Sequence, residues 1–144
     1  MFSADLVRPM AEVMKKLGSR HVMVVHSRDG LDEISAAAST FVAELKDGAI
    51  TEYELEPAEF GQVAESLAEL AVADAAGSLT IIEAVLDGES GPGHAMIALN
   101  AGAAIYVSGQ ADSLAEGIAH ASDILYQGRA LERLRRYAER SRNL

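Results

Sequence analysis

One short apolar run constrains the fold of this chain more than any other feature. Residues 21–25 read HVMVV, and three of the five are valine. Valine favours β-structure, and an unbroken apolar run predicts a strand buried on both faces, as in a parallel sheet. Parallel strands need parallel neighbours, and no other segment offers this pattern. We therefore expect the chain to be one part of a larger sheet.

A β-hairpin is predicted after this strand. Residues 27–30 (SRDG) indicate a turn, and TFVAEL, KDG and AITEYEL then read as two strands joined by a tight turn. Ile50 and Tyr53 fall outside simple alternation, which predicts a bulge. Pro57 and Gly61 end the hairpin.

Helices are predicted on both sides of these strands. The first covers residues 4–17, with Ser3 or Asp5 as its cap and with Pro9 causing a kink or a late start. The chain after Gly61 reads as helical, in the following segments: a weakly periodic stretch over 62–72, a helix capped by Asp74 and stopped by Gly88, a helix from Pro92 rich in small residues, a helix with a capping box at Ser113–Glu116 closed by Gly128, and a last helix.

Composition limits the class of protein. The chain has 144 residues, of which 49% are hydrophobic, so we expect one partial α/β domain over residues 1–144. A net charge of −10 disfavours nucleic acid as a partner. The chain has no cysteine, which excludes disulfides and thiol catalysis, and no apolar run reaches about 18 residues, so we expect no membrane contact and a cytoplasmic location.

Asp32 and Glu33 are the candidate site. They follow the apolar strand and Gly30. Mg²⁺ prefers oxygen ligands and commonly takes one or two carboxylates, with waters and substrate phosphates completing its shell. Consecutive side chains point apart in an extended chain, so both acids can reach one ion only if the backbone turns. The alternative is that the pair only shapes a turn, and the residues alone leave both readings open.

Several segments carry a resemblance to a known family. The stretch VVHSRDGLDEIS and the later LNAGAAIYVSGQADSLAEGIAHASDIL closely resemble segments of anthranilate phosphoribosyltransferases. RPMAEVMKKLGSRH, VAELKDGAITEYELEPAEFG and IIEAVLDGESGP are similar to other parts of that family. The resemblance covers nearly the whole chain. It implies a C-terminal fragment of the phosphoribosyltransferase and nucleoside phosphorylase-like α/β domain, with one buried strand and a β-hairpin packed against several helices.

The resemblance also implies a function. The family transfers phosphoribose from phosphoribosyl pyrophosphate to the amine of anthranilate, in tryptophan biosynthesis. Its adjacent Asp-Glu pair holds magnesium beside the pyrophosphate, which assigns that role to Asp32 and Glu33. One departure is Ser27, where the family usually has glycine after the histidine.

The match leaves out parts of the family pattern. A glycine-rich GTGGD-type segment and an N-terminal helical domain have no counterpart in these residues. We therefore expect a truncated chain that is inactive alone, completed by a missing N-terminal half or by a second copy. Two alternatives remain: a non-catalytic assembly module derived from the enzyme, and a fragment similar to pyrimidine nucleoside phosphorylases.

Two further polar residues have structural interpretations. Asn100 lies in an apolar helical segment, where a buried amide needs partners, so a structural hydrogen bond is favoured over a substrate contact. His26 ends the apolar strand, and packing or a hydrogen bond is favoured over a role in the cleft.

Overall fold

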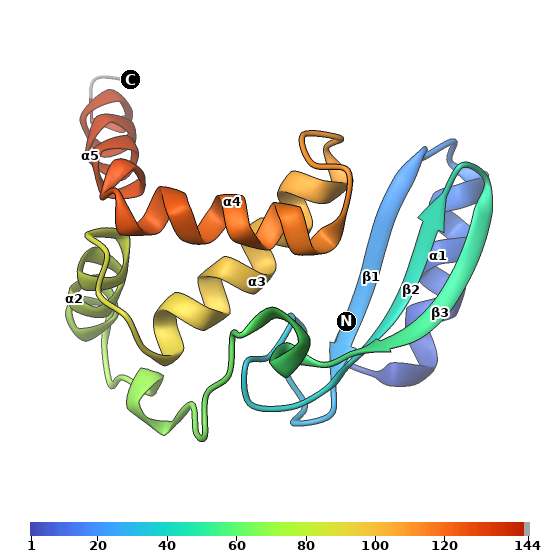
Figure 1. Ribbon diagram of the computed structural model, residues 1–144, viewed down its shortest axis with the longest axis horizontal. Helices are drawn as coiled ribbons and strands as arrows, with labels where there is room; N and C mark the ends of the chain where they lie inside the picture. The colour runs from blue at the N-terminus through green and yellow to red at the C-terminus, as the bar shows by residue number, and fades with distance from the viewer. Residues whose placement is uncertain (143–144) are drawn as a thin grey trace.

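The computed structural model describes residues 1–142, which form an α/β fold (Figure 1). Five α-helices are formed: α1 (Val7–Lys16), α2 (Ala75–Leu86), α3 (Pro92–Val107), α4 (Leu114–Tyr126) and α5 (Arg129–Ser141). The three strands are β1 (His21–Ser27), β2 (Thr40–Lys46) and β3 (Ala49–Leu55). Three 3₁₀ turns accompany them: η1 (Ala4–Leu6), η2 (Pro57–Phe60) and η3 (Ala68–Leu70).

The sheet is antiparallel throughout the described chain. The strand order is β1-β2-β3, so β1 lies at one edge and pairs only with β2. Among the described residues, β1 therefore has only an antiparallel neighbour, and the parallel neighbours expected from the rest of a larger sheet stay a prediction. The apolar run still serves both faces of the sheet, because Met23 and Val25 pack on one cluster and Val24 on the other.

The hairpin has no bulge, contrary to the sequence-based expectation. Each residue of β2 pairs with one of β3, from Thr40 with Leu55 to Lys46 with Ala49, around a two-residue turn. Ile50 and Tyr53 broke the simple alternation because they serve opposite faces, and each packs on a different apolar cluster.

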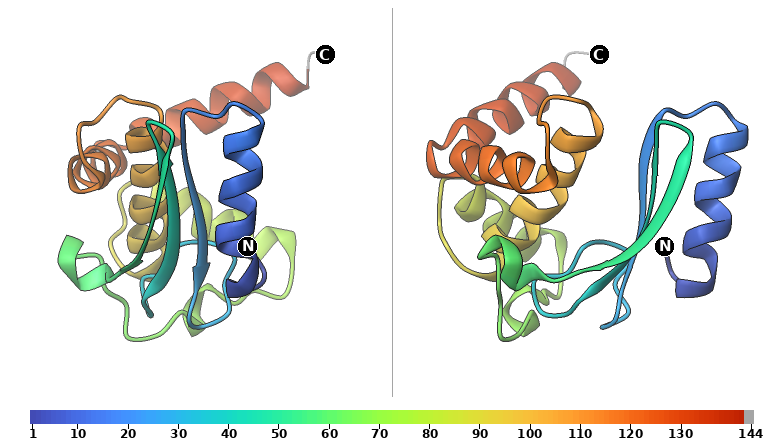
Figure 2. Two further views of the ribbon diagram at one scale, coloured as in Figure 1. Left: turned by 90° about the vertical axis from the view of Figure 1, so that its right-hand side faces the viewer. Right: turned by 45° about the vertical axis from the view of Figure 1, so that its right-hand side comes forward.

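Helices cover both faces of the sheet. Helix α1 lies along one face, whereas α3 and α4 lie on the other, with α2 and α5 farther away (Figure 2). The smaller cluster, between the sheet and α1, is built on Val7, Ala11, Val24 and Ala43. The larger cluster fills the space between the sheet and α3.

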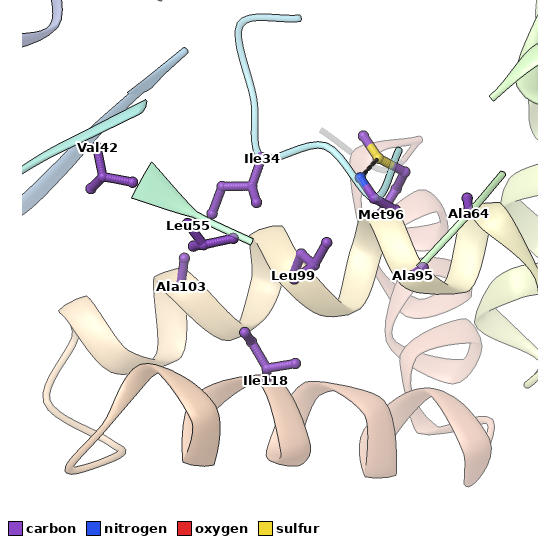
Figure 3. Close-up of a cluster of buried hydrophobic side chains, with 10 residues drawn as sticks. Ile34, Val42, Leu55, Ala64, Ala95, Met96, Leu99, Ala103 and Ile118 are labelled. Carbon is purple, nitrogen blue, oxygen red and sulfur yellow. Dashed lines mark hydrogen bonds between the residues drawn. The ribbon is translucent and has the colours of Figure 1, made fainter. Parts of the chain in front are cut away.

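The larger cluster joins the segment after β1 to the sheet and the helices (Figure 3). Ile34, Leu55 and Leu99 are its most buried large side chains, each no more than 1% exposed. Small residues of α3 allow this packing, since Ala95 and Ala103 lie on the same side of the helix as Leu99. Helix α3 is the most buried of the five described helices, with seven of its residues buried.

Two of the predicted helix caps form in the structure. Asp74 accepts from the Gly77 amide (2.8 Å) and Ser113 from the Glu116 amide (3.2 Å), as predicted. Neither Ser3 nor Asp5 caps a helix through its side chain, because α1 begins at Val7 after η1. Pro9 causes no break, since its missing N–H falls in the first turn, where no intrahelical partner exists.

Residues 62–72 are the largest error in the predicted helices. Only η3 forms within this stretch, and the rest has no regular structure. Phe60, Leu67 and Leu70 pack individually against the larger cluster, and the Ala64 amide donates to the Ala36 carbonyl (2.9 Å). That bond ties the segment to the loop after β1, so contacts with distant residues hold it in an irregular path.

Candidate metal-binding site

The candidate site lies in the loop between β1 and β2, residues 28–39, called here the acidic loop. Backbone hydrogen bonds close its base: Ser27 N–H donates to Leu31 O (3.0 Å) and Arg28 N–H to Ser39 O (2.9 Å). Gly30 has φ of +92°, which glycine adopts without the strain of a side chain. The buried Ser27 hydroxyl also donates to Ser39 O (3.3 Å), so the departure from glycine at this position adds a bond to the loop.

Asp32 and Glu33 are exposed at a bend in this loop. Adjacent side chains can approach one ion only if the backbone turns, and the backbone bends at Asp32 and Glu33. No hydrogen bond or ion pair within residues 1–142 uses the side-chain oxygens of either residue. The backbone of Asp32 is held separately, since its carbonyl accepts from the Met1 ammonium group (3.0 Å).

Three carboxylates of the acidic loop lie close enough to influence one another: Asp29, Asp32 and Glu33. Partial burial raises the pKa of the Glu33 carboxyl, and the negative charges of Asp32 and Asp29 raise it further. Asp29 differs: burial acts to raise its pKa, but donation from Ser35, Ser27 and the Leu31 amide holds the pKa below its ordinary value. The Ser35 hydroxyl donates to Asp29 at 2.6 Å, so Asp29 braces the loop while the other two carboxylates remain unbonded.

The far side of the acidic loop is anchored in the core. Ile34 is 1% exposed and packs in the larger cluster. The Asn100 side chain bonds both backbone groups of Ile34, and the Ala36 amide donates to Met96 Sδ (3.2 Å; dashed in Figure 3). The structural hydrogen bond predicted for Asn100 is confirmed.

The donor set fits Mg²⁺. Within the described residues, no group of three or more His, Cys, Asp or Glu converges on a common point. Asp32 and Glu33 would thus be the protein's share of a shell otherwise made of waters and phosphate oxygens, which is the usual arrangement for this ion. Both are hard oxygen donors without a competing partner, and the charge they concentrate favours a divalent cation.

Sequence reasoning missed a second polar cluster, on the α3 face of the sheet. Glu44 accepts from His21 (2.8 Å), Tyr106 (2.8 Å) and Tyr53 (2.9 Å). Burial acts to raise the pKa of Glu44, but these hydrogen bonds lower it below its ordinary value. The four residues lie on β1, β2, β3 and α3, so only the folded chain brings them together. The cluster ties the sheet to α3.

His26 has the structural role favoured for it. Its Nδ1 atom lies 2.7 Å from the Met1 carbonyl oxygen. Along the described chain, no helix combines the length and the apolar character needed to cross a membrane.

Comparison with known proteins relates this loop and fold to one group of enzymes. The chain is 54% identical over 132 residues to an anthranilate phosphoribosyltransferase of Marinomonas sp., covering 90% of this chain and 38% of that protein. The structure of an anthranilate phosphoribosyltransferase from Thermus thermophilus superposes on this chain with a TM-score of 0.85 at 35% sequence identity. The match covers 94% of this chain and 40% of the Thermus thermophilus chain.

A more distant structure shares the fold. The Saccharomyces cerevisiae anthranilate phosphoribosyltransferase in complex with PRPP and Mg has a TM-score of 0.83 at 24% identity, covering 99% of this chain and 42% of that one. The chain thus spans about two-fifths of the length of the curated relatives it matches. The model of the glycosyl transferase family, a/b domain, matches residues 1–131. On this match, which takes in the sheet, the acidic loop and α1 to α4, the chain belongs to the glycosyl transferase family, a/b domain.

Proposed function

We propose that this chain forms part of an anthranilate phosphoribosyltransferase, in which Asp32 and Glu33 hold magnesium beside the pyrophosphate of phosphoribosyl pyrophosphate. The observation that carries the proposal is the pair of exposed, unbonded carboxylates at the bend of the acidic loop. The identity to relatives named as this enzyme supports it. Tryptophan biosynthesis is the proposed pathway, and a cytoplasmic location stays a prediction.

The chemistry of the reaction explains why two acids suffice here. The bond from the ribose carbon to pyrophosphate breaks as the bond to the anthranilate amine forms and the amine nitrogen loses one proton to solvent, so negative charge grows on the departing group. Magnesium, when bound, would neutralise that charge. Asp32 and Glu33 would hold the ion from one side and leave its other positions to waters and phosphate oxygens. No nucleophilic side chain is needed for this transfer.

We further propose that the rest of the active site is supplied by a segment equivalent to the other three-fifths of the relatives, on the same polypeptide or on another. The surface that fits it is the exposed apolar stripe of α1 together with the open edge of β1. The stripe runs at helical spacing along α1 and its two flanking residues, beside the face that packs on the sheet, and its members are at least 36% exposed: Leu6, Met10, Val13 and Leu17.

The edge of β1 adds backbone groups to this surface. The Met1 ammonium group donates to Val25 O (2.6 Å), which identifies the side of β1 that faces away from β2. N–H and C=O groups of alternate residues point to the same side of a strand, so those of Met23 face this edge as well. A further strand can add along this edge if it replaces the Met1 ammonium group at Val25 O.

Reconstitution tests the proposal. The chain is mixed with a separately produced polypeptide covering the remaining part of a relative, and consumption of anthranilate is measured with phosphoribosyl pyrophosphate and Mg²⁺. We expect activity only in the mixture, and loss of at least about 100-fold in the double variant Asp32→Asn/Glu33→Gln. The matched control is Glu56→Gln/Glu59→Gln, an exposed acid pair outside the loop.

Three outcomes would count against the proposal. Full activity of the double variant would remove the assigned roles of Asp32 and Glu33. Self-association of the chain without any response to the second polypeptide would favour the assembly module. Phosphorolysis of a pyrimidine nucleoside by the mixture, in place of anthranilate transfer, would favour the phosphorylase-like alternative.

A further inference from the structure

Asn100 uses its whole side-chain amide on the acidic loop and its own helix. Its Oδ1 accepts from the Ile34 amide (2.9 Å), and its Nδ2 donates to Ile34 O (2.8 Å) and to Met96 O (2.9 Å). One side chain thereby bonds both polar backbone groups of a single residue, as a neighbouring β-strand would. The two residues are 66 positions apart, so this contact joins α3 directly to the loop.

The bonded amide is the one that immediately follows Glu33. The Ile34 N–H belongs to the peptide unit between Glu33 and Ile34, so fixing it fixes the backbone dihedral on the C-terminal side of Glu33. The Ile34 side chain is 1% exposed in the larger cluster, which holds the same residue from a second direction. The backbone of Glu33 is thus tied to the core, whereas its carboxylate is exposed.

We propose that Asn100 is a positioning residue for magnesium, acting through the Ile34 backbone to set the direction of Asp32 and Glu33. The inference rests on the proposed function of that pair. Mg²⁺ demands near-ideal octahedral geometry, so the Glu33 carboxylate meets it only if the backbone that carries this side chain keeps its orientation. Groups behind metal ligands typically change metal affinity by about 10–100-fold when removed.

A purely structural role for Asn100 predicts something different. The buried backbone groups of Ile34 need partners in any case, and losing those partners would lower the stability of the fold without affecting metal binding. The test therefore needs a control variant that loses a comparable hydrogen bond elsewhere on α3. Tyr106→Phe serves, because it removes the donor to Glu44 (2.8 Å) and leaves the acidic loop untouched.

The experiment measures binding of Mn²⁺, a probe that accepts the same oxygen ligands, by water-proton relaxation on the full chain. Amide hydrogen exchange at Ile34 and urea unfolding are recorded on the same samples. For Asn100→Ala we expect faster exchange at Ile34 and a Mn²⁺ dissociation constant raised about tenfold. For Tyr106→Phe we expect a loss of stability with an unchanged dissociation constant.

A second variant keeps the test decisive if Asn100→Ala does not fold. Asn100→Asp keeps the shape and the acceptor for the Ile34 amide but loses the donor to Ile34 O. Its added negative charge would by itself strengthen cation binding, so weaker Mn²⁺ binding would report lost positioning. Binding stronger than that of the wild type would overturn the inference.

The outcomes separate this inference from the proposed function. If the wild-type chain binds Mn²⁺ and Asn100→Ala binds it equally well despite faster exchange at Ile34, the positioning role is refuted and the metal site stands. If wild type and Asp32→Asn/Glu33→Gln give the same signal, Asp32 and Glu33 hold no ion. The proposed site then fails, and the role of Asn100 fails with it.

Discussion

Gly102 of α3 and Gly117 of α4 face each other so closely that a Cβ atom on either would lie under 3.0 Å from the backbone of the opposite helix. Gly102 would meet the backbone of Ile118, and Gly117 would meet the Gly102 carbonyl oxygen. The obstacle is main chain in both directions, so a side-chain rotation cannot relieve it. The two glycines set the distance between the most buried helix and its neighbour.

Gly117→Ala should therefore destabilise the fold. Overpacking typically lowers the free energy of unfolding by about 1–3 kcal/mol. Replacing glycine by alanine within a helix raises it by about 1 kcal/mol. Because the clash is with backbone, we expect a net loss of at least about 1 kcal/mol, measured as the free energy of unfolding in urea. Ala119→Ser, on the exposed side of α4, is the control and should change it by less than about 0.5 kcal/mol. Equal stability of the two variants would contradict the close approach.

The Glu44 cluster should make stability depend on acid. Its folded-state pKa lies below the ordinary value of 4.5, so the unfolded chain binds more protons as the pH falls through this range. The stabilisation is complete above about pH 4.5 and is lost as the pH drops through the folded-state pKa. Unfolding free energies between about pH 6 and 3 should fall less steeply for Glu44→Gln than for wild type. Glu56→Gln should keep the wild-type slope, and a wild-type slope in Glu44→Gln would contradict the role of the cluster.

His94 should give a second, separate pH dependence. It is 3% exposed in α3, its Nε2 lies 2.8 Å from Ser122 Oγ, and its Nδ1 has no hydrogen-bond partner among the described residues. Burial lowers the pKa of His94 from its ordinary 6.5, so the folded state favours the neutral ring. This contribution is present above about pH 6.5 and is lost as the pH falls through the lowered pKa.

The comparison that tests this uses two histidine variants. Between about pH 7.5 and 5, His94→Leu should lose less unfolding free energy than wild type, because it has no buried ring to protonate. His120→Leu, at an exposed position on α4, should follow the wild-type curve. The assignment fails if His94→Leu and wild type show the same slope over this range.

The α1 stripe predicts where assembly can be blocked. Val13→Glu would place a charge in the middle of the stripe, and burying an unpaired charge is costly. We expect reconstituted activity to fall at least about tenfold at limiting concentration of the second polypeptide, while the unfolding free energy of the chain alone changes by less than about 0.5 kcal/mol. Val63→Glu, also at an exposed valine, is the control. Undiminished activity of Val13→Glu would show that assembly uses another surface.

Local patterns predicted most of the elements. Valine enrichment identified β1, and the turn residues placed both strands of the hairpin. Asp74 and Ser113 marked helix starts through their capping groups. These features depend on neighbours within a few positions, which is why the sequence carries them.

Features that depend on distant contacts were harder to predict. The segment 62–72 is held by a hydrogen bond to the acidic loop. Strand β1 pairs with β2, and local sequence patterns do not indicate which strand lies beside it. The sequence indicated that Asn100 needs partners but carried no signal that Ile34 supplies them. Asp29 read as a turn residue, and only the fold shows its carboxylate bonded to Ser35.

The contact between Gly102 and Gly117 also limits how the two helices can move. Helices whose main chains touch cannot slide past each other, so we expect α3 and α4 to move as one unit, and Asn100 fastens the acidic loop to that unit. Any displacement of the acidic loop at Ile34 should therefore carry α3 and α4 with it.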